Sequence, residues 1–281
     1  MIFMVKRNFF LLVPFILIVV FLISQSSILE KINMKLNKPK LVPIDTRQPT
    51  ESNINGKVKV KYPQDYTLVL LGDSITEKLG NCDELLAYLK KYYPSRTFQI
   101  LNYGYGATNI LSVSERLEKE TFHGRIFRPV LDIVFDLILI ESFGHNPLSE
   151  FPLEEGLKKQ TESLEKIVKS IKEANPSAKI VFVATLAPNK KKYGEGQVDL
   201  TTEKRAQWAS ERMKYIENHI KYAKDHNIPL VNIYEDSKSG TDGGNLDYFD
   251  KKDYIHPSPN GVYFISKEIA KYIFEKRIFP R

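Results

Sequence analysis

The chain has 281 residues, and its 41 lysines and arginines outnumber its 34 aspartates and glutamates, which gives a formal net charge of +7. With 42% apolar and 27% charged residues, the composition excludes a disordered chain or a fibrous repeat and is typical of a globular protein. The single cysteine, Cys82, excludes an intrachain disulfide and a cysteine-based zinc cluster.

The positive charge is concentrated at the start of the chain. Residues 1–65 contain ten basic and four acidic side chains, a net of +6, whereas the remaining 216 residues contain 31 basic and 30 acidic side chains, a net of +1. Binding to a nucleic-acid backbone requires a basic surface on the folded domain. The nearly neutral remainder therefore argues against a nucleic-acid partner.

Residues 1–29 have the pattern of an export segment. Lys6 and Arg7 precede an uncharged, largely apolar run from Phe9 to Ile23. As a helix, fifteen residues are about 22 Å long, which is short of a bilayer core of about 30 Å unless the segment continues to residue 29. A buried core helix is the simpler alternative, but the basic flank, the terminal position and the missing amphipathic period disfavour it.

Two fates of this segment stay open. A cleaved signal peptide would use Ser24 and Ser26 as the small residues before the cleavage site. An uncleaved signal-anchor would keep the N-terminus inside, next to Lys6 and Arg7. The anchor is favoured because no Ala-x-Ala site is present and a tether-like segment follows. Either way we expect export, as a single-pass membrane protein with its domain outside the cell or as a secreted protein.

Residues 30–65 are expected to form a basic, extended linker, because they are rich in Lys, Asn and Pro and have no helical period. The run Lys57–Lys61 alternates like a strand, but a lysine at every second position suggests a solvated edge or a spacer. If the anchor is retained, the lysines from Lys31 to Lys61 could lie against an anionic membrane surface.

Residues 66–281 alternate between strand and helix patterns, and we treat them as one domain. Strands are expected at residues 67–71, 97–102, 136–141, 178–186 and 229–233, and helices at residues 83–93, 110–120, 153–174, 201–226 and 258–275. This alternation predicts an α/β fold with a parallel sheet covered by helices on both faces. Ligands of such sheets bind beyond the carboxyl ends of the strands.

The first two strands end in turn sequences whose residues are suited to catalysis. Gly72-Asp73-Ser74 follows the first strand and presents a serine at the edge of the sheet, although these residues are also common in plain turns. Gly104 and Gly106 follow the second strand, where glycines let backbone N–H groups approach a ligand closely. A plain loop is the simpler interpretation of either segment taken alone.

Two later segments add an amide, two imidazoles and a carboxylate. After the third strand comes Asn146, whose side-chain amide could stabilise an oxyanion. His145 beside it could serve as a base, but an exposed loop histidine without a role is the simpler interpretation. Asp253 and His256 stand three residues apart after the fifth strand, close enough for the carboxylate to orient the imidazole. Together the four segments contain each group that acyl transfer requires.

In order and position these segments resemble the four sequence blocks of the SGNH hydrolases, also called GDSL esterases and lipases. The resemblance implies a three-layer α/β/α fold with a flavodoxin-like sheet of five parallel strands over residues 66–281. It implies that Ser74 is the nucleophile, with His256 as its base and Asp253 as the partner of the base. The oxyanion hole would consist of the backbone N–H of Ser74 and Gly106 and the side chain of Asn146.

Two departures from the family pattern concern the oxyanion hole. The second block usually reads Asn-x-Gly-x-x-Gly and is one residue shorter here, so Gly104 is an alternative donor to Gly106. The third block usually continues Asn-Asp, whereas Pro147 follows Asn146 in this chain.

The resulting hypothesis is an exported serine esterase that acts on carbohydrate or cell-wall esters, without a metal or organic cofactor. Short acyl groups are favoured because no long apolar lid segment lies beside the motifs. An O-acyltransferase with the same triad and an inactive extracellular binding module are the alternatives. Nothing in the sequence specifies an oligomeric state.

Overall fold

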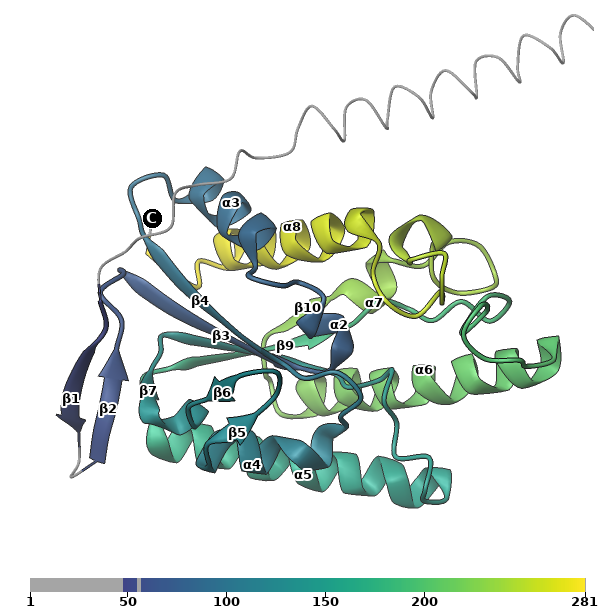
Figure 1. Cartoon of the computed structure of the whole chain (residues 1–281), viewed down its shortest axis with the longest axis horizontal. Coiled ribbons are helices and arrows are strands. Elements are labelled where there is room, and N and C mark those ends of the chain that lie inside the picture. The colour runs from purple at the N-terminus through teal and green to yellow at the C-terminus, as the bar shows by residue number, and fades with distance from the viewer. Residues whose placement is uncertain (1–47, 55–56, 281) are drawn as a thin grey trace, which may run out of the picture. The chain divides into compact units, whose positions relative to one another are not determined.

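The structure of the chain is a computed structural model that describes residues 48–54 and 57–280 (Figure 1). The predicted export segment and most of the predicted linker lie outside these residues. Within the described part of the chain, no helix has both the length and the apolar character needed to cross a membrane.

A sheet of five parallel strands forms the centre of the domain. In spatial order the strands are β10 (Leu230–Asn232), β9 (Lys179–Ala184), β8 (Leu137–Glu141), β3 (Tyr66–Gly72) and β4 (Phe98–Gly104). After β4 the chain crosses back over β3 to β8, so that the strand order reverses between β3 and β8. Ligand sites in open α/β sheets lie at such reversals, beyond the carboxyl ends of the strands.

Helices cover both faces of this sheet, as the alternation of sequence patterns predicts. The helices are α2 (Ser74–Glu77), α3 (Asp83–Tyr92), α4 (Val113–Glu118), α5 (Leu153–Ala174), α6 (Thr202–Asp225), α7 (Ile233–Asp236) and α8 (Pro259–Glu275). Helices α3 and α8 pack on one face, and α4, α5 and α6 pack on the other (Figure 1).

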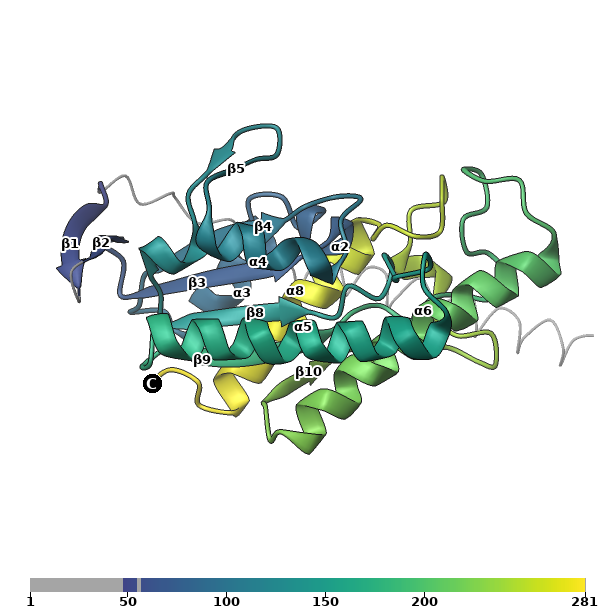
Figure 2. The same ribbon diagram turned by 90° about the horizontal axis from the view of Figure 1, so that it is seen from below.

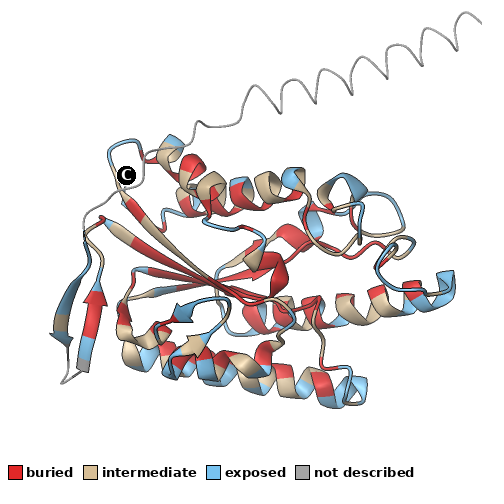
Figure 3. Cartoon of the chain, in the orientation of Figure 1, coloured by how far each residue is buried: buried red, intermediate tan, exposed pale blue. Residues whose placement is uncertain are grey.

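The sequence of β3 shows why both faces must be covered. Leu68 and Leu70 belong to the core under α3 and α8, whereas Val69 and Leu71 belong to the core under α4, α5 and α6. Alternate side chains of a strand point to opposite faces, so four consecutive apolar residues need a helical layer on each side. All four are buried, and the central strands are buried along most of their length (Figure 3). The predicted three-layer α/β/α fold is confirmed.

The region expected to be a solvated spacer forms a hairpin instead. Strands β1 (Thr50–Ile54) and β2 (Lys57–Lys61) pair in antiparallel orientation, and the other edge of β2 pairs in parallel with β7 (Ile133–Val134). Lys59 is only 4% exposed, because its Nζ donates to the carbonyl of Ala174, at 2.6 Å, and to Oδ1 of Asn175 at the end of α5. A lysine at a helix C-terminus satisfies carbonyl groups that have no partner within the helix.

The hairpin therefore corrects the interpretation of Lys57–Lys61 as a solvated edge. Lys59 is buried because the acceptors next to it belong to the end of a helix, which the sequence of the hairpin does not reveal. The predicted domain boundary at residue 65 stays a prediction.

Candidate active site

Ser74 lies directly after β3, at the first position of the short helix α2. Asp73 precedes it as the N-cap of this helix, and its Oδ1 accepts the N–H of Ile75 at 2.8 Å. A side chain at Gly72 would overlap the Thr76 side chain, with its Cβ 2.0 Å from Oγ1. The glycine thus lets α2 turn back tightly onto the strand, and this turn carries Ser74 to the carboxyl edge of the sheet.

Asp253 and His256 form a carboxylate–imidazole pair within one short segment. His256 Nδ1 lies 2.7 Å from Oδ2 of Asp253, while Oδ1 of Asp253 accepts the backbone N–H groups of Ile255 and His256 at 2.8 and 3.0 Å. Burial opposes the charge of Asp253, but the hydrogen bonds from the imidazole and the backbone outweigh it and lower the pKa of this carboxyl. The charged carboxylate holds a proton on Nδ1 and leaves Nε2 as the basic nitrogen.

Asn146 follows β8 and is held by the N-cap of α2. Its Nδ2 donates to Oδ2 of Asp73 at 2.9 Å. Asp73 is fully buried and its backbone N–H donates to Glu141, whose pKa is raised well above its ordinary value by burial, then by the charge of Asp73 and a hydrogen bond to it. One amide hydrogen of Asn146 is therefore fixed beneath the site, and the other remains as a donor for a ligand.

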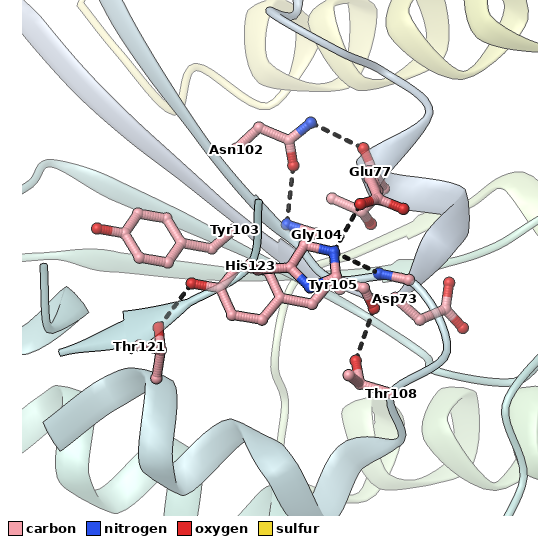
Figure 4. Close-up of polar contacts among 12 residues, drawn as sticks. Asp73, Glu77, Asn102, Tyr103, Gly104, Tyr105, Thr108, Thr121 and His123 are labelled. Carbon is pink, nitrogen blue, oxygen red and sulfur yellow. Dashed lines mark hydrogen bonds and ion pairs between the residues drawn. The ribbon is translucent and has the colours of Figure 1, made fainter. Parts of the chain in front are cut away.

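The two glycines after β4 have different environments. The N–H of Gly104 donates to Oδ1 of Asn102 at 2.8 Å, and a Cβ at this position would lie 2.2 Å from the backbone nitrogen of Glu77 (Figure 4). Gly104 therefore serves the close packing of β4 on α2. Gly106 instead lines the cavity that contains Ser74. Gly106 therefore borders the same cavity as Ser74, and Gly104 does not.

A second carboxylate–imidazole pair lies on the Gly106 side. His123 Nε2 is 2.6 Å from Oε1 of Glu77 and 3.3 Å from the backbone nitrogen of Gly106. Its ring stacks on Tyr105, with ring centroids 4.6 Å apart and an interplanar angle of 9° (Figure 4). Neither Glu77 nor His123 could be predicted as a site residue, because neither stands in a recognisable spacing with the other motifs.

His145 is buried, which corrects its interpretation as an exposed loop histidine. Its Nε2 lies 3.0 Å from the carbonyl of Leu186, and its Nδ1 lies 3.1 Å from the hydroxyl of Tyr193. A carbonyl can only accept, so Nε2 carries the proton and Nδ1 accepts from Tyr193. Burial lowers the pKa of His145 to about 4. The imidazole is thus a neutral structural group with both nitrogens engaged.

Arg116 joins the carboxyl ends of β3 and β4. It is a further residue near the site that the sequence did not indicate. Its guanidinium is buried and donates to the carbonyls of Gly72 and Tyr103 and to the hydroxyls of Thr108 and Ser112. Burial lowers its pKa to about 10, which still leaves it charged at neutral pH. A lone arginine in an amphipathic helix pattern gives no sign of such a role.

One cavity of about 520 Å³ collects the predicted site residues. Ser74, Gly106, Asn146 and His256 all line it, together with the second pair, Glu77 and His123; the other lining residues are Lys78, Ala107, His145, Tyr193, Trp208, Arg212 and Ile255. Asp253 stands behind His256. Within the described residues, Ser74 and His256 line this cavity together but their side chains share no hydrogen bond.

Comparison with known proteins gives the same fold and family. A sequence model of the GDSL-like lipase/acylhydrolase family matches residues 70–262, which is more than half of the chain. No curated protein matches the chain.

Solved structures share the fold at low sequence identity. The lipase/acylhydrolase from Enterococcus faecalis is 18% identical with a TM-score of 0.50, covering 75% of this chain and 96% of that one. A GDSL-like lipase from Bacteroides thetaiotaomicron is 15% identical with a TM-score of 0.50, covering 75% of this chain and 88% of that one. With the family match, which spans the segments of Ser74, Gly106, Asn146 and His256, these findings show that the chain belongs to the GDSL-like lipase/acylhydrolase family and is an ester hydrolase.

Proposed function

We propose that the protein is an exported serine esterase that removes short acyl groups from carbohydrate or cell-wall esters through an acyl-enzyme. The observation that carries the mechanism is the shared cavity. It places Ser74, a His256 oriented by Asp253, and the donors Gly106 and Asn146 around one space at the strand ends.

Each group has a role that its surroundings support. His256 Nε2 takes the proton of the Ser74 hydroxyl as Oγ attacks the ester carbonyl. The negative oxygen that develops receives hydrogen bonds from the N–H groups of Ser74 and Gly106 and from the Asn146 amide. His256 then returns the proton to the departing alcohol, and water repeats the sequence on the acyl-enzyme. The lowered pKa of Asp253 supports its part, since a charged carboxylate stabilises the imidazolium that forms in between.

The aromatic and charged side chains on the cavity wall support a carbohydrate ester as substrate. In the part of the chain that the structure describes, Ala107 and Ile255 are the only aliphatic residues on its wall. The sole tryptophan, Trp208, lies there with Arg212, whose guanidinium carbon is 4.9 Å from the centre of a Trp208 ring. An aromatic face beside charged donors suits a sugar, which offers C–H groups and hydroxyls.

Replacing the nucleophile tests the mechanism. Ser74→Ala should abolish turnover of p-nitrophenyl acetate by the full-length chain, and it should prevent covalent labelling by a fluorophosphonate. Thermal unfolding of both proteins serves as the control for folding. Undiminished turnover by a folded Ser74→Ala variant would overturn the assignment. Incubating the wild type with acetylated oligosaccharides and acceptor sugars then tests the substrate, since free acetate indicates hydrolysis and acetylated acceptor indicates transfer.

A further inference from the structure

His123 stands at the turn of a small hairpin that reaches the active site. Strands β5 (Thr121–Phe122) and β6 (Ile126–Phe127) form this hairpin, which stands out from the body of the domain (Figure 2). The turn is closed by a hydrogen bond from His123 N–H to the carbonyl of Arg125, and Gly124 adopts a φ of +69° within it. The Thr121 and Tyr105 hydroxyls, 2.8 Å apart, join the hairpin to the segment after β4.

One ring nitrogen of His123 faces two partners. Its Nε2 lies 2.6 Å from Glu77 Oε1, a distance that requires a proton between the two atoms. The backbone N–H of Gly106 also points at Nε2, with the two nitrogens 3.3 Å apart. An imidazole nitrogen has a single position in the ring plane, for either a proton or a lone pair. Because the contact with Glu77 uses that position, the Gly106 N–H lacks a full acceptor.

The His123 ring therefore occupies the place that a substrate oxygen needs. An oxygen that accepts from Gly106 must lie about 2.9 Å from its nitrogen along the N–H direction. Nε2 of His123 now lies in that direction. An amide that faces a poor acceptor gains more from a new one than an amide already satisfied.

We propose that His123 is a specificity-determining gate over the oxyanion hole, held in place by Glu77. The ring covers the Gly106 donor in the free enzyme and must move aside when an ester carbonyl enters. Only a substrate whose binding energy displaces the ring obtains the complete oxyanion hole. This inference rests on the proposed roles of Ser74 and Gly106.

The contact that holds His123 to Glu77 is weak enough for a substrate to break it. The side chains of His123 and Glu77 are 31% and 41% exposed, and partly exposed ion pairs contribute little to stability. Each strand of the hairpin has two residues, and Phe122 and Ile126 on it are 76% and 66% exposed. The buried Phe127 anchors the hairpin, so His123 leaves Gly106 by turning its side chain, which breaks the Glu77 contact and the stack on Tyr105.

The test measures how fast Ser74 reacts when the ring is absent. A fluorophosphonate forms a bond from Ser74 Oγ to phosphorus, fluoride leaves, His256 accepts the serine proton, and the phosphoryl oxygen takes the oxyanion hole. With the full-length chain, His123→Ala should raise the second-order rate constant of labelling, and kcat/KM for p-nitrophenyl acetate, about threefold to tenfold, the range expected for losing one partly exposed hydrogen-bonded pair. The same variant should unfold at a slightly lower temperature, because the Glu77 contact is lost.

Two further variants separate gating from general disturbance. Thr121→Val removes the hydrogen bond to Tyr105 and leaves every cavity side chain in place, so it should accelerate labelling by a smaller factor. Phe122→Ser, on the exposed face of the hairpin, should change neither rate. A His123→Ala variant that is labelled at the wild-type rate or more slowly would overturn the gate. A wild type that is not labelled at all would instead overturn the proposed function.

Discussion

The cavity contains two carboxylate–imidazole pairs that use the same chemical groups in different ways. Asp253 contacts Nδ1 of His256, whereas Glu77 contacts Nε2 of His123. The first carboxylate is 13% exposed and accepts two backbone N–H groups as well, whereas the second is 41% exposed. The first pair lies within one short segment, and the second joins α2 to the tip of a hairpin.

This difference shows that the choice of ring nitrogen assigns the role. A carboxylate on Nδ1 leaves Nε2, at the far end of the ring, as a base that can reach a nucleophile. A carboxylate on Nε2 engages the nitrogen that faces Gly106, so the imidazole of His123 covers a donor and is not directed at Ser74 as a base. Burial and backbone hydrogen bonds then make the first pair rigid and leave the second one movable.

Removing the charge of each carboxylate in turn should give the largest difference in activity between the two pairs. Asp253→Asn keeps the size of the side chain but removes the charge that fixes the His256 tautomer, so kcat for p-nitrophenyl acetate should fall by about 10³–10⁴-fold, as in other serine triads. Glu77→Gln should change kcat/KM by less than about tenfold, and upward, because it loosens the gate. Steady-state kinetics of both variants at pH 7 make the measurement.

Folding controls accompany this pair of variants. Both should show the near-ultraviolet circular dichroism of the wild type, since each substitution preserves side-chain volume. Equal losses of activity in the two variants would contradict the division of roles between the pairs.

The two glycines beside Glu77 provide a test with a smaller effect, on stability. A Cβ at Gly104 would lie 2.2 Å from the backbone nitrogen of Glu77, and a Cβ at Gly106 would lie 2.5 Å from Oε2 at the end of its side chain. Backbone cannot move aside cheaply, so Gly104→Ala should lower the free energy of unfolding by about 3 kcal/mol or more. Gly106→Ala should cost less than about 1 kcal/mol, because the Glu77 carboxylate can rotate away.

Urea unfolding of the three proteins measures these free energies. A Gly106→Ala variant that is destabilised as much as Gly104→Ala would mean that the end of the Glu77 side chain cannot move. The gate would then have lost its physical basis.

Most of the fold could be predicted from the sequence because its strands are buried on both faces. An uninterrupted run such as residues 68–71 has few alternatives to a central parallel strand, and each long helix carries its own amphipathic period. Ser258 also marks the start of α8, and its hydroxyl accepts the N–H of Gly261. The small sheets could not be predicted in this way, because β5, β6 and β7 have only two residues each and Lys59 is buried against a helix end 115 residues away in the chain.

The residues of the candidate site also divide into those that the sequence could predict and those that only the fold brings together. Ser74 and Asn146 come within a few residues of the ends of predicted strands, so the position of the sheet edge places them. The segment from Asp253 to His256 comes just before the predicted helix at residues 258–275, and the start of this helix places it. His123 comes 46 residues after its partner Glu77, and only the packing of its hairpin on Tyr105 brings the two together. His145 has the same loop setting in sequence as an exposed residue, and its burial depends on Tyr193 and Leu186.

His145, the third imidazole on the cavity wall, gives a test with a smaller effect of how burial determines the role of a histidine. Burial lowers its pKa from 6.5 to about 4, so below pH 6.5 the unfolded chain binds a proton that the folded chain does not bind until about pH 4. Folding stability should therefore fall as the pH drops through this window, by up to about 3 kcal/mol for the whole gap. Glutamine does not titrate in this range. Between pH 7 and pH 4.5 the free energy of unfolding of His145→Gln should therefore fall by about 2 kcal/mol less than that of the wild type.

Urea unfolding of both proteins at the two pH values gives this difference. His219, whose pKa burial lowers to about 3, is present in both proteins and cancels in the comparison. An equal loss in wild type and variant would mean that His145 already accepts a proton near pH 6.5. Burial alone would then not distinguish a structural histidine from a reactive one in this cavity.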